Sequence, residues 1–231
     1  MKKQLKSGFI LLTLLALLLS TNSFALEEGG YVGNDVRAIP VVWNFIRHFV
    51  WDQYFWAAPF MFTFWNNYFV DNMDFAYYCG HGAPWFIMTY FGGINLATAG
   101  SSAHRGYGDR DLEFITFHSC SVIPSPLETP NWWQPWVREP TDIFDGLHQA
   151  IGFRTPAWVA SAPWISNFYG LLIRWNFNVA MSWFWSINWF GLPGEKGCIV
   201  MWPPAVWDRY YWPKCADPPQ NHTWLMCLYQ I

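Results

Sequence analysis

The sequence predicts an α/β fold, a single domain built on a mostly parallel sheet flanked by helices. Two strand-length apolar runs, residues 73–79 and 112–117, are rich in aromatic and β-branched residues and end at glycine or polar residues. A helix expected over residues 143–150 and a short strand expected over 151–155 follow the second run. Strands that alternate with helices form parallel βαβ units, so these elements indicate a parallel sheet.

Residues 1–25 are typical of a bacterial secretory signal peptide. A basic start is followed by an apolar run over residues 9–19 and by small residues that end at Ala25. A membrane anchor is the alternative, but the apolar run is too short to span a bilayer comfortably. We therefore expect a mature domain over residues 26–231, in the periplasm or secreted from the cell.

The segments around the two apolar runs give weaker patterns. Residues 26–37 are expected to be irregular, a helix is expected over about residues 41–54, and residues 60–70 are interpreted as a strand that turns at Asn66-Asn67. Residues 85–94 predict a strand or a hairpin.

The second half of the chain continues the α/β pattern. Residues 167–192 read as an amphipathic helix packed on the sheet, with a helix at a membrane interface as the alternative. Residues 197–202 predict a final strand, and the tail after them is expected to be irregular.

Aromatic residues make up 21% of the chain, including 18 tryptophans. Core packing is the expectation for most of them, and contact with sugars or a membrane surface is the alternative. The net charge of −3, without a basic patch, argues against a nucleic-acid partner.

Five cysteines follow the predicted cleavage point. A secreted chain is expected to pair many of its cysteines, and an odd number leaves one over. Cys215 and Cys227, in the Pro-rich tail, are the favoured disulfide, and Cys120 is the candidate free thiol.

Polar residues follow both apolar runs at the point where each strand ends. If the strands are parallel neighbours, His81 and Cys120 lie at one edge of the sheet, where open α/β sheets hold ligands. A cysteine near a histidine suggests a thiol nucleophile and its base.

Two other interpretations use the same region. The pairs Cys79/His81 and His118/Cys120 are each spaced by two residues, so each pair shares a strand face and the four side chains could bind Zn²⁺. A Cys79–Cys120 disulfide is the other alternative, and it would abolish the nucleophile. On its own, His118 is expected to be buried and hydrogen-bonded.

The motifs at residues 77–82 (YYCGHG) and 115–120 (ITFHSC) resemble those of the caspase-like cysteine peptidases, which include caspases, legumains, gingipains and separases. The resemblance covers roughly residues 73–155. The overall sequence pattern is also similar to that of an uncharacterised secreted bacterial family with that fold. It implies a caspase-like domain in which Cys120 attacks a peptide or amide carbonyl and His81 protonates the leaving amine. It further implies an oxyanion hole formed by the backbone N–H groups of Gly82 and Cys120, a peptide or protein substrate, and no metal or cofactor.

The sequence leaves substrate preference and catalysis open. Arg105, Arg110 and Arg154 are candidates for binding an acidic substrate side chain; Asp109 and Asp111 are candidates for a basic one, or ordinary turn and cap residues. The alternative function is a non-catalytic binding module whose Trp-rich loops, such as residues 131–136, contact a glycan, a peptide or a membrane surface.

Overall fold

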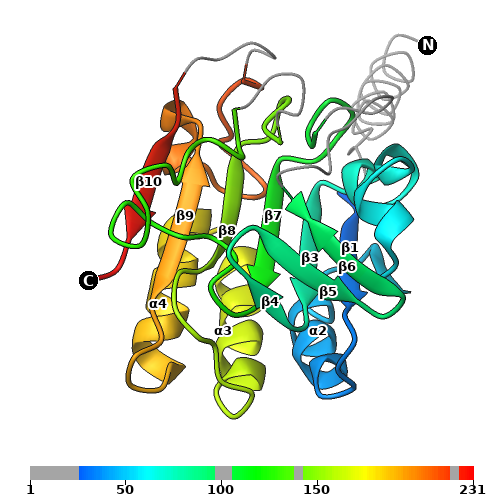
Figure 1. Cartoon of the computed structure of the whole chain (residues 1–231). Coiled ribbons are helices and arrows are strands. Elements are labelled where there is room, and N and C mark those ends of the chain that lie inside the picture. Colours follow the sequence, from blue (N-terminus) through cyan, green and yellow to red (C-terminus); the bar gives the residue numbers. More distant parts are fainter. Residues whose placement is uncertain (1–25, 97–105, 138–142, 219–223) are drawn as a thin grey trace, which may run out of the picture.

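The computed structural model describes residues 26–96, 106–137, 143–218 and 224–231, and the signal peptide expected over residues 1–25 lies outside them. A seven-stranded sheet of order β10-β9-β8-β7-β3-β1-β2 runs through the molecule (Figure 1). Its parallel strands are β1 (Glu28–Val32), β2 (Asp52–Trp56), β3 (Phe75–Cys79), β7 (Phe114–His118) and β8 (Gln149–Phe153). Strand β9 (Gly197–Met201) is antiparallel to β8, and β10 (Met226–Tyr229) is antiparallel to β9. The predicted α/β fold with a mostly parallel sheet is confirmed, and β3 and β7 are its central neighbours.

Three helices cover one face of this sheet: α2 (Ala38–Ile46), α3 (Ala162–Arg174) and α4 (Val179–Phe190) (Figure 1). Alternate strand residues such as Phe75, Tyr77 and Phe114 point into this layer and pack against the apolar sides of the helices. Helix α2 comes close to β1 because Gly30 has no side chain; a Cβ there would lie 2.6 Å from a methyl group of Val42.

The other face is covered by short elements. A small antiparallel sheet of β4 (Gly82–Ala83), β5 (Phe86–Thr89) and β6 (Gly92–Asn95) lies there with the 3₁₀ turns η1 (Pro59–Phe62), η2 (Asn66–Tyr68) and η3 (Val70–Asn72). The hairpin expected over residues 85–94 is therefore confirmed, whereas the strand expected over residues 60–70 is wrong.

The first part of the domain differs from the expectation. Residues 26–37 contain the inner strand β1 instead of an irregular segment, because Gly29 and Gly30 provide space for neighbouring side chains. The helix expected over residues 41–54 begins earlier and ends at Ile46, and β2 follows it.

The helix expected over residues 143–150 is wrong. Phe144 bridges to Tyr107, and Gly146 adopts φ of +113° where the chain crosses so close to Gly108 that a Cβ on either glycine would clash. The cap residues Thr141 and Asp142 of that expected helix lie outside the described residues. Strand β8 begins at Gln149, slightly before the strand expected over residues 151–155.

The last part of the chain is more regular than expected. The single helix expected over residues 167–192 is two helices, because Asn176 has φ of +58° and the Asn178 side chain caps α4 by accepting the Met181 N–H. The 3₁₀ turn η5 (Pro203–Trp207) follows β9, and the tail contributes β10 to the sheet, which the sequence did not indicate.

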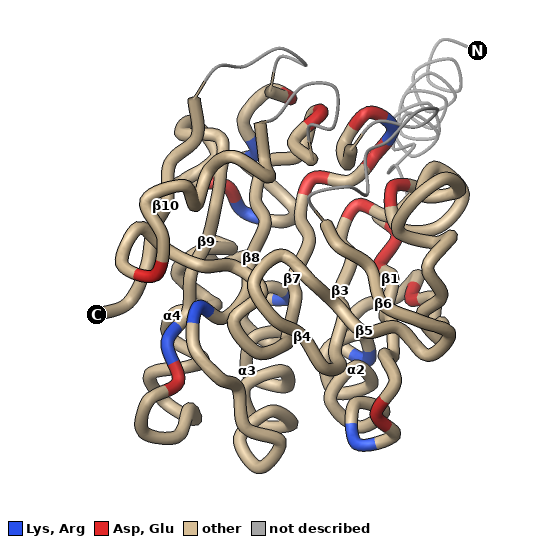
Figure 2. The backbone as a smooth tube through the Cα atoms, in the orientation of Figure 1, with Lys and Arg blue, Asp and Glu red and all other residues tan. Residues whose placement is uncertain are grey.

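Aromatic residues divide by type between core and surface. The buried core is rich in Phe and Tyr, as core packing predicts, whereas 13 of the 18 tryptophans are exposed, so core packing fails for most of the tryptophans. In the described part of the chain, no helix has both the length and the apolar character needed to cross a membrane. Lys and Arg are scattered along the described chain, while Asp and Glu gather near the amino-terminal ends of the central strands (Figure 2).

Candidate active site at the carboxyl edge of the sheet

The ends of β3 and β7 bring the two predicted site residues together. Cys79 and His118 are register partners at the last position of the two strands, and His81 and Cys120 each follow two residues later. Both His81 and Cys120 line one pocket with a volume of about 110 Å³, whose wall also includes Asp35 and Ala157. Parallel neighbouring strands thus deliver a histidine and a cysteine to one edge, as the sequence predicted.

A hydrogen bond joins the two loops that carry these residues. The Ser119 hydroxyl donates to the Gly80 carbonyl at 2.8 Å, so the residue before Cys120 is tied to the residue before His81. Gly82 packs against the same serine, and a Cβ on Gly82 would clash with the Ser119 oxygen. Gly82 pairs with Ile87 in the small sheet and follows His81, which lines the pocket.

The Cys120 thiol is free and partly exposed. The backbone turns sharply after it, since Ser121 has φ of +53° and its N–H donates to the Thr155 carbonyl at 3.0 Å. The Ala157 N–H donates to Cys120 Sγ at 3.3 Å. The Cys120 thiol in turn donates to the Ala157 carbonyl at 3.5 Å, so both polar backbone groups of Ala157 contact the sulfur.

His81 has an acidic partner that the sequence did not reveal. Asp35 Oδ2 lies 3.5 Å from His81 Nε2, and Asp35 follows β1 at the same edge of the sheet. The Arg37 side chain and backbone N–H bind the Asp35 carboxylate and hold its pKa below the usual value, so Asp35 is charged. An acidic residue shortly after the apolar pair Tyr31-Val32 could have indicated a site residue at a strand end. It was missed because residues 26–37 were expected to be irregular and not to contain a strand.

The zinc interpretation of this region is not supported. Among the described residues, the group of metal-ligand side chains that converges lies elsewhere and contains neither Cys79, His81, His118 nor Cys120.

His118 and Cys79 are buried residues that also line the pocket. The His118 Nδ1 lies 2.6 Å from the Tyr77 hydroxyl, so His118 is buried and hydrogen-bonded as expected. Burial lowers the pKa of His118 to about 3 and raises the pKa of the Cys79 thiol. Both groups are therefore neutral near pH 7.

Cysteine pairing differs from the prediction, and all five thiols are free in the structure. The alternative Cys79–Cys120 bond is absent. Cys227 Sγ lies 3.3 Å from Cys198 Sγ, while Cys215 Sγ lies 3.5 Å from His148 Nδ1. The expected Cys215–Cys227 disulfide is therefore wrong, because the two residues face different partners.

The four described residues suggested for substrate preference are not among those that line the pocket. Arg110 donates to the Asn67 carbonyl, and Arg154 pairs with Glu128. Asp109 and Asp111 precede β7, at the opposite edge of the sheet, and Arg105 lies outside the described residues. The charged side chains of the pocket wall are instead those of Asp35 and Arg37, and His81 lies beside Asp35.

Comparison with known proteins gives a family without an assigned activity. The model of a family described as "Domain of unknown function (DUF6345)" matches residues 21–183, which is more than half of the chain. The matched region contains Asp35, His81 and Cys120. No curated protein matches the chain.

Proposed function

The chain belongs to the DUF6345 family, a domain family of unknown function, and we propose that it is a cysteine-dependent hydrolase of peptide or amide bonds. The observation that carries the proposal is the shared pocket of His81 and Cys120, at the ends of neighbouring parallel strands. Asp35 beside His81 and the Ala157 N–H on the Cys120 sulfur give each member of the pair a supporting group.

The proposed reaction has two steps. The Cys120 thiolate attacks the carbonyl carbon, and the amine leaves with a proton from His81, which gives a thioester on Cys120. Water then attacks the thioester while His81 takes one of its protons, which releases the carboxylic acid and restores the Cys120 thiolate and the protonated His81. Because Asp35 lies at Nε2, we assign the exchanged proton to Nδ1 of His81.

The oxyanion that forms in each step needs hydrogen-bond donors. We assign this role to the backbone N–H groups of Gly82 and Cys120. The hydrogen bond from Ser119 to Gly80 supports this assignment, because it fixes the loops after β3 and β7 relative to each other.

We further propose that the domain is caspase-like and exported by its signal peptide. Five parallel strands followed by an antiparallel one, with the histidine after β3 and the cysteine after β7, support the first point. A peptide or protein would then be the substrate.

A peptide library tests the activity. The purified protein is incubated with the library, and new termini are read by mass spectrometry. We expect cleavage by the wild type and by Cys227→Ala, and none by Cys120→Ala. Equal cleavage by Cys120→Ala and the wild type would refute the proposal.

The exposed tryptophans favour a second candidate, a binding module without catalysis. The loop over residues 131–136 contributes little to it, since Trp136 is fully buried and Trp132 packs against the core. Exposed aromatic residues gather instead near β2 and the small sheet, where the Trp56 and Tyr90 rings lie 5.2 Å apart. Glycan arrays and liposome sedimentation test this function; binding that survives Cys120→Ala, without proteolysis by the wild type, would favour it.

A further inference from the structure

Three side chains of different chemistry converge at the edge of the sheet opposite the pocket. His148 immediately precedes β8, Asp208 follows η5, and Cys215 lies in the segment before β10. One ligand atom from each lies within 4.8 Å of the other two. Since His81 and Cys120 follow their strands whereas His148 precedes its own, this cluster is separate from the candidate active site.

The distances within the cluster are short. His148 Nδ1 lies 2.6 Å from Asp208 Oδ2, and Cys215 Sγ lies 3.5 Å from that nitrogen and 3.3 Å from that oxygen. Zn²⁺ bonds of about 2.0–2.3 Å place tetrahedral ligand atoms roughly 3.3–3.7 Å apart. The two distances to sulfur are therefore close to those of a zinc site, and only the nitrogen–oxygen pair has to separate by less than about 1 Å.

The backbone holds the three residues in place without a ligand. The His148 N–H donates to the Glu113 carbonyl at 3.0 Å, which fixes the start of β8 beside β7. The Cys215 N–H donates to Asp208 Oδ1 at 2.7 Å, which orients the carboxylate and leaves Oδ2 directed at the histidine. His148 and Asp208 are buried, and Cys215 is half-buried, so the cluster is open on the cysteine side.

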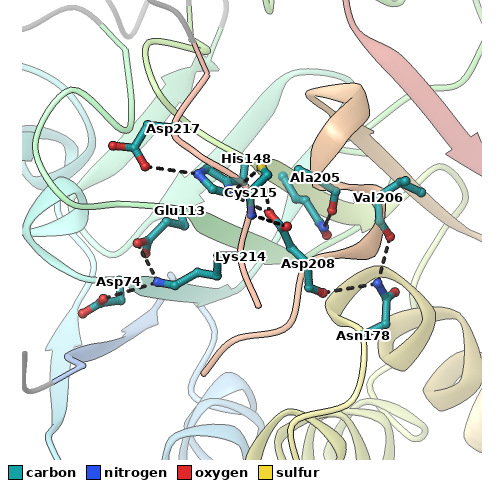
Figure 3. Close-up of polar contacts among 11 residues, drawn as sticks. Asp74, Glu113, His148, Asn178, Ala205, Val206, Asp208, Lys214, Cys215 and Asp217 are labelled. Carbon is teal, nitrogen blue, oxygen red and sulfur yellow. Dashed lines mark hydrogen bonds and ion pairs between the residues drawn. The ribbon is translucent and has the colours of Figure 1, made fainter. Parts of the chain in front are cut away.

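Surrounding charges also suit a cation. Asp217 Oδ1 lies 3.5 Å from His148 Nε2, the position of the carboxylate that commonly orients a metal-binding histidine. Lys214 does not compete for the site, because it is turned toward Glu113, at 2.6 Å, and Asp74 (Figure 3).

We propose that His148 Nδ1, Asp208 Oδ2 and Cys215 Sγ bind a Zn²⁺ ion, with water in the fourth position. A nitrogen, an oxygen and a sulfur ligand together suit Zn²⁺ and disfavour Mg²⁺ and Ca²⁺, which prefer oxygen. Binding releases the Cys215 proton to solvent, while the histidine carries its remaining proton on Nε2, 3.5 Å from Asp217 Oδ1. The ion fastens the segment from Asp208 to Cys215 to the start of β8 and stabilises the folded chain.

Cobalt substitution tests the site directly, because Co²⁺ bound to a thiolate gives a charge-transfer absorption. We expect this absorption in the wild type and in the matched controls Cys227→Ser and Cys120→Ser, and its loss in Cys215→Ser. Asp217→Asn keeps the absorption but weakens Zn²⁺ binding about tenfold. Absence of the absorption in the wild type, its persistence in Cys215→Ser, or its loss in either control would overturn the proposal.

Alkylation of the wild-type protein gives a test that does not depend on the folding of a variant. Iodoacetamide is added with and without Zn²⁺, and each cysteine is quantified by peptide mapping. We expect Zn²⁺ to slow modification of Cys215 and leave that of Cys227 unchanged. Equal rates at Cys215 with and without Zn²⁺ would contradict the site.

Discussion

The carboxylate of Asp35 lies 3.5 Å from Nε2 of His81, although the two residues follow different strands of the sheet. Strand β1 delivers Asp35 and strand β3 delivers His81 to the same edge, because the two strands are parallel neighbours in register. Arg37 keeps the carboxylate charged by lowering its pKa. We assign Asp35 the role of orienting the histidine ring that works with Cys120.

Removing the charge of Asp35 should slow the reaction moderately. The His81 side chain is 60% exposed, and exposed ion pairs contribute about 0.2–1 kcal/mol, so we expect Asp35→Asn to lower kcat/KM by up to about fivefold. Asp35→Glu should retain more activity, and thermal stability should change little in either variant. A loss of activity that is explained by unfolding of the variant would contradict the orienting role. Equal activity of the wild type, Asp35→Asn and Asp35→Glu would also contradict it.

The buried His118 predicts a pH-dependent loss of stability. Its pKa falls from 6.5 in the unfolded chain to about 3 in the folded chain. Between these two pH values the unfolded chain therefore binds a proton that the folded chain does not bind. The free energy of unfolding should therefore decrease by about 1.4 kcal/mol per pH unit as the pH falls through this window.

The comparison with His118→Gln isolates this effect. Glu28 and Glu113 have pKa values raised to about 7 by burial and titrate in the opposite sense, so the wild-type curve alone is not informative. Urea unfolding between about pH 6.5 and about pH 4 should show a smaller loss of stability in the variant. Parallel curves for the two proteins would show that His118 does not titrate as described.

Cys198 and Cys227 should form a disulfide in an oxidising buffer. Their sulfur atoms lie 3.3 Å apart on the antiparallel strands β9 and β10. With oxidised glutathione as the oxidant, the two thiols lose two protons and two electrons and yield two molecules of reduced glutathione. The half-buried Cys227 meets the oxidant first, because Cys198 is fully buried.

Peptide mapping under non-reducing conditions detects the bond. Closing a loop between residues 29 apart should stabilise the folded chain by about 3.6 kcal/mol, so oxidation should raise Tm in the wild type and not in Cys198→Ser. A mapped bond between Cys215 and Cys227 would show instead that the tail pairs differently.

Two tryptophans of one loop should behave differently. Trp136 is fully buried, whereas Trp133 is 44% exposed. Trp136→Ala should destabilise the chain by about 3–5 kcal/mol through the cavity it leaves, and Trp133→Ala should change stability by less than about 0.5 kcal/mol. Chemical denaturation measures the free energy of unfolding of both variants. Similar losses of stability in the two variants would mean that the loop packs differently.

The sequence predicts the centre of the molecule well because the signals there are local. Residues 73–79 and 112–117 are apolar on both faces, as central parallel strands are. Strand β3 lies within the first run, and β7 overlaps the second and ends one residue after it. Once these strands are parallel neighbours, the meeting of His81 and Cys120 at one edge follows from topology.

The missed elements depend on contacts between distant segments. Gly29 and Gly30 indicate a loop when read locally, but in the fold they let α2 and other side chains approach β1, and Asp35 was missed with that strand. Residues 143–150 resemble a capped helix, yet the close crossing of Gly108 and Gly146 imposes a different backbone. The cluster of His148, Asp208 and Cys215 spans 67 residues of sequence and has no motif spacing.

The reactivity of Cys120 tests the central proposal most directly. The purified wild-type protein is treated with iodoacetamide at neutral pH, and the label on each of the five cysteines is followed with time by peptide mapping. We expect Cys120 to be labelled fastest, its labelling to slow in His81→Gln, and hydrolysis to fall in step with its modification. Labelling of Cys120 no faster than that of the buried Cys79 and Cys198, or hydrolysis that persists in Cys120→Ala, would contradict the proposed nucleophile.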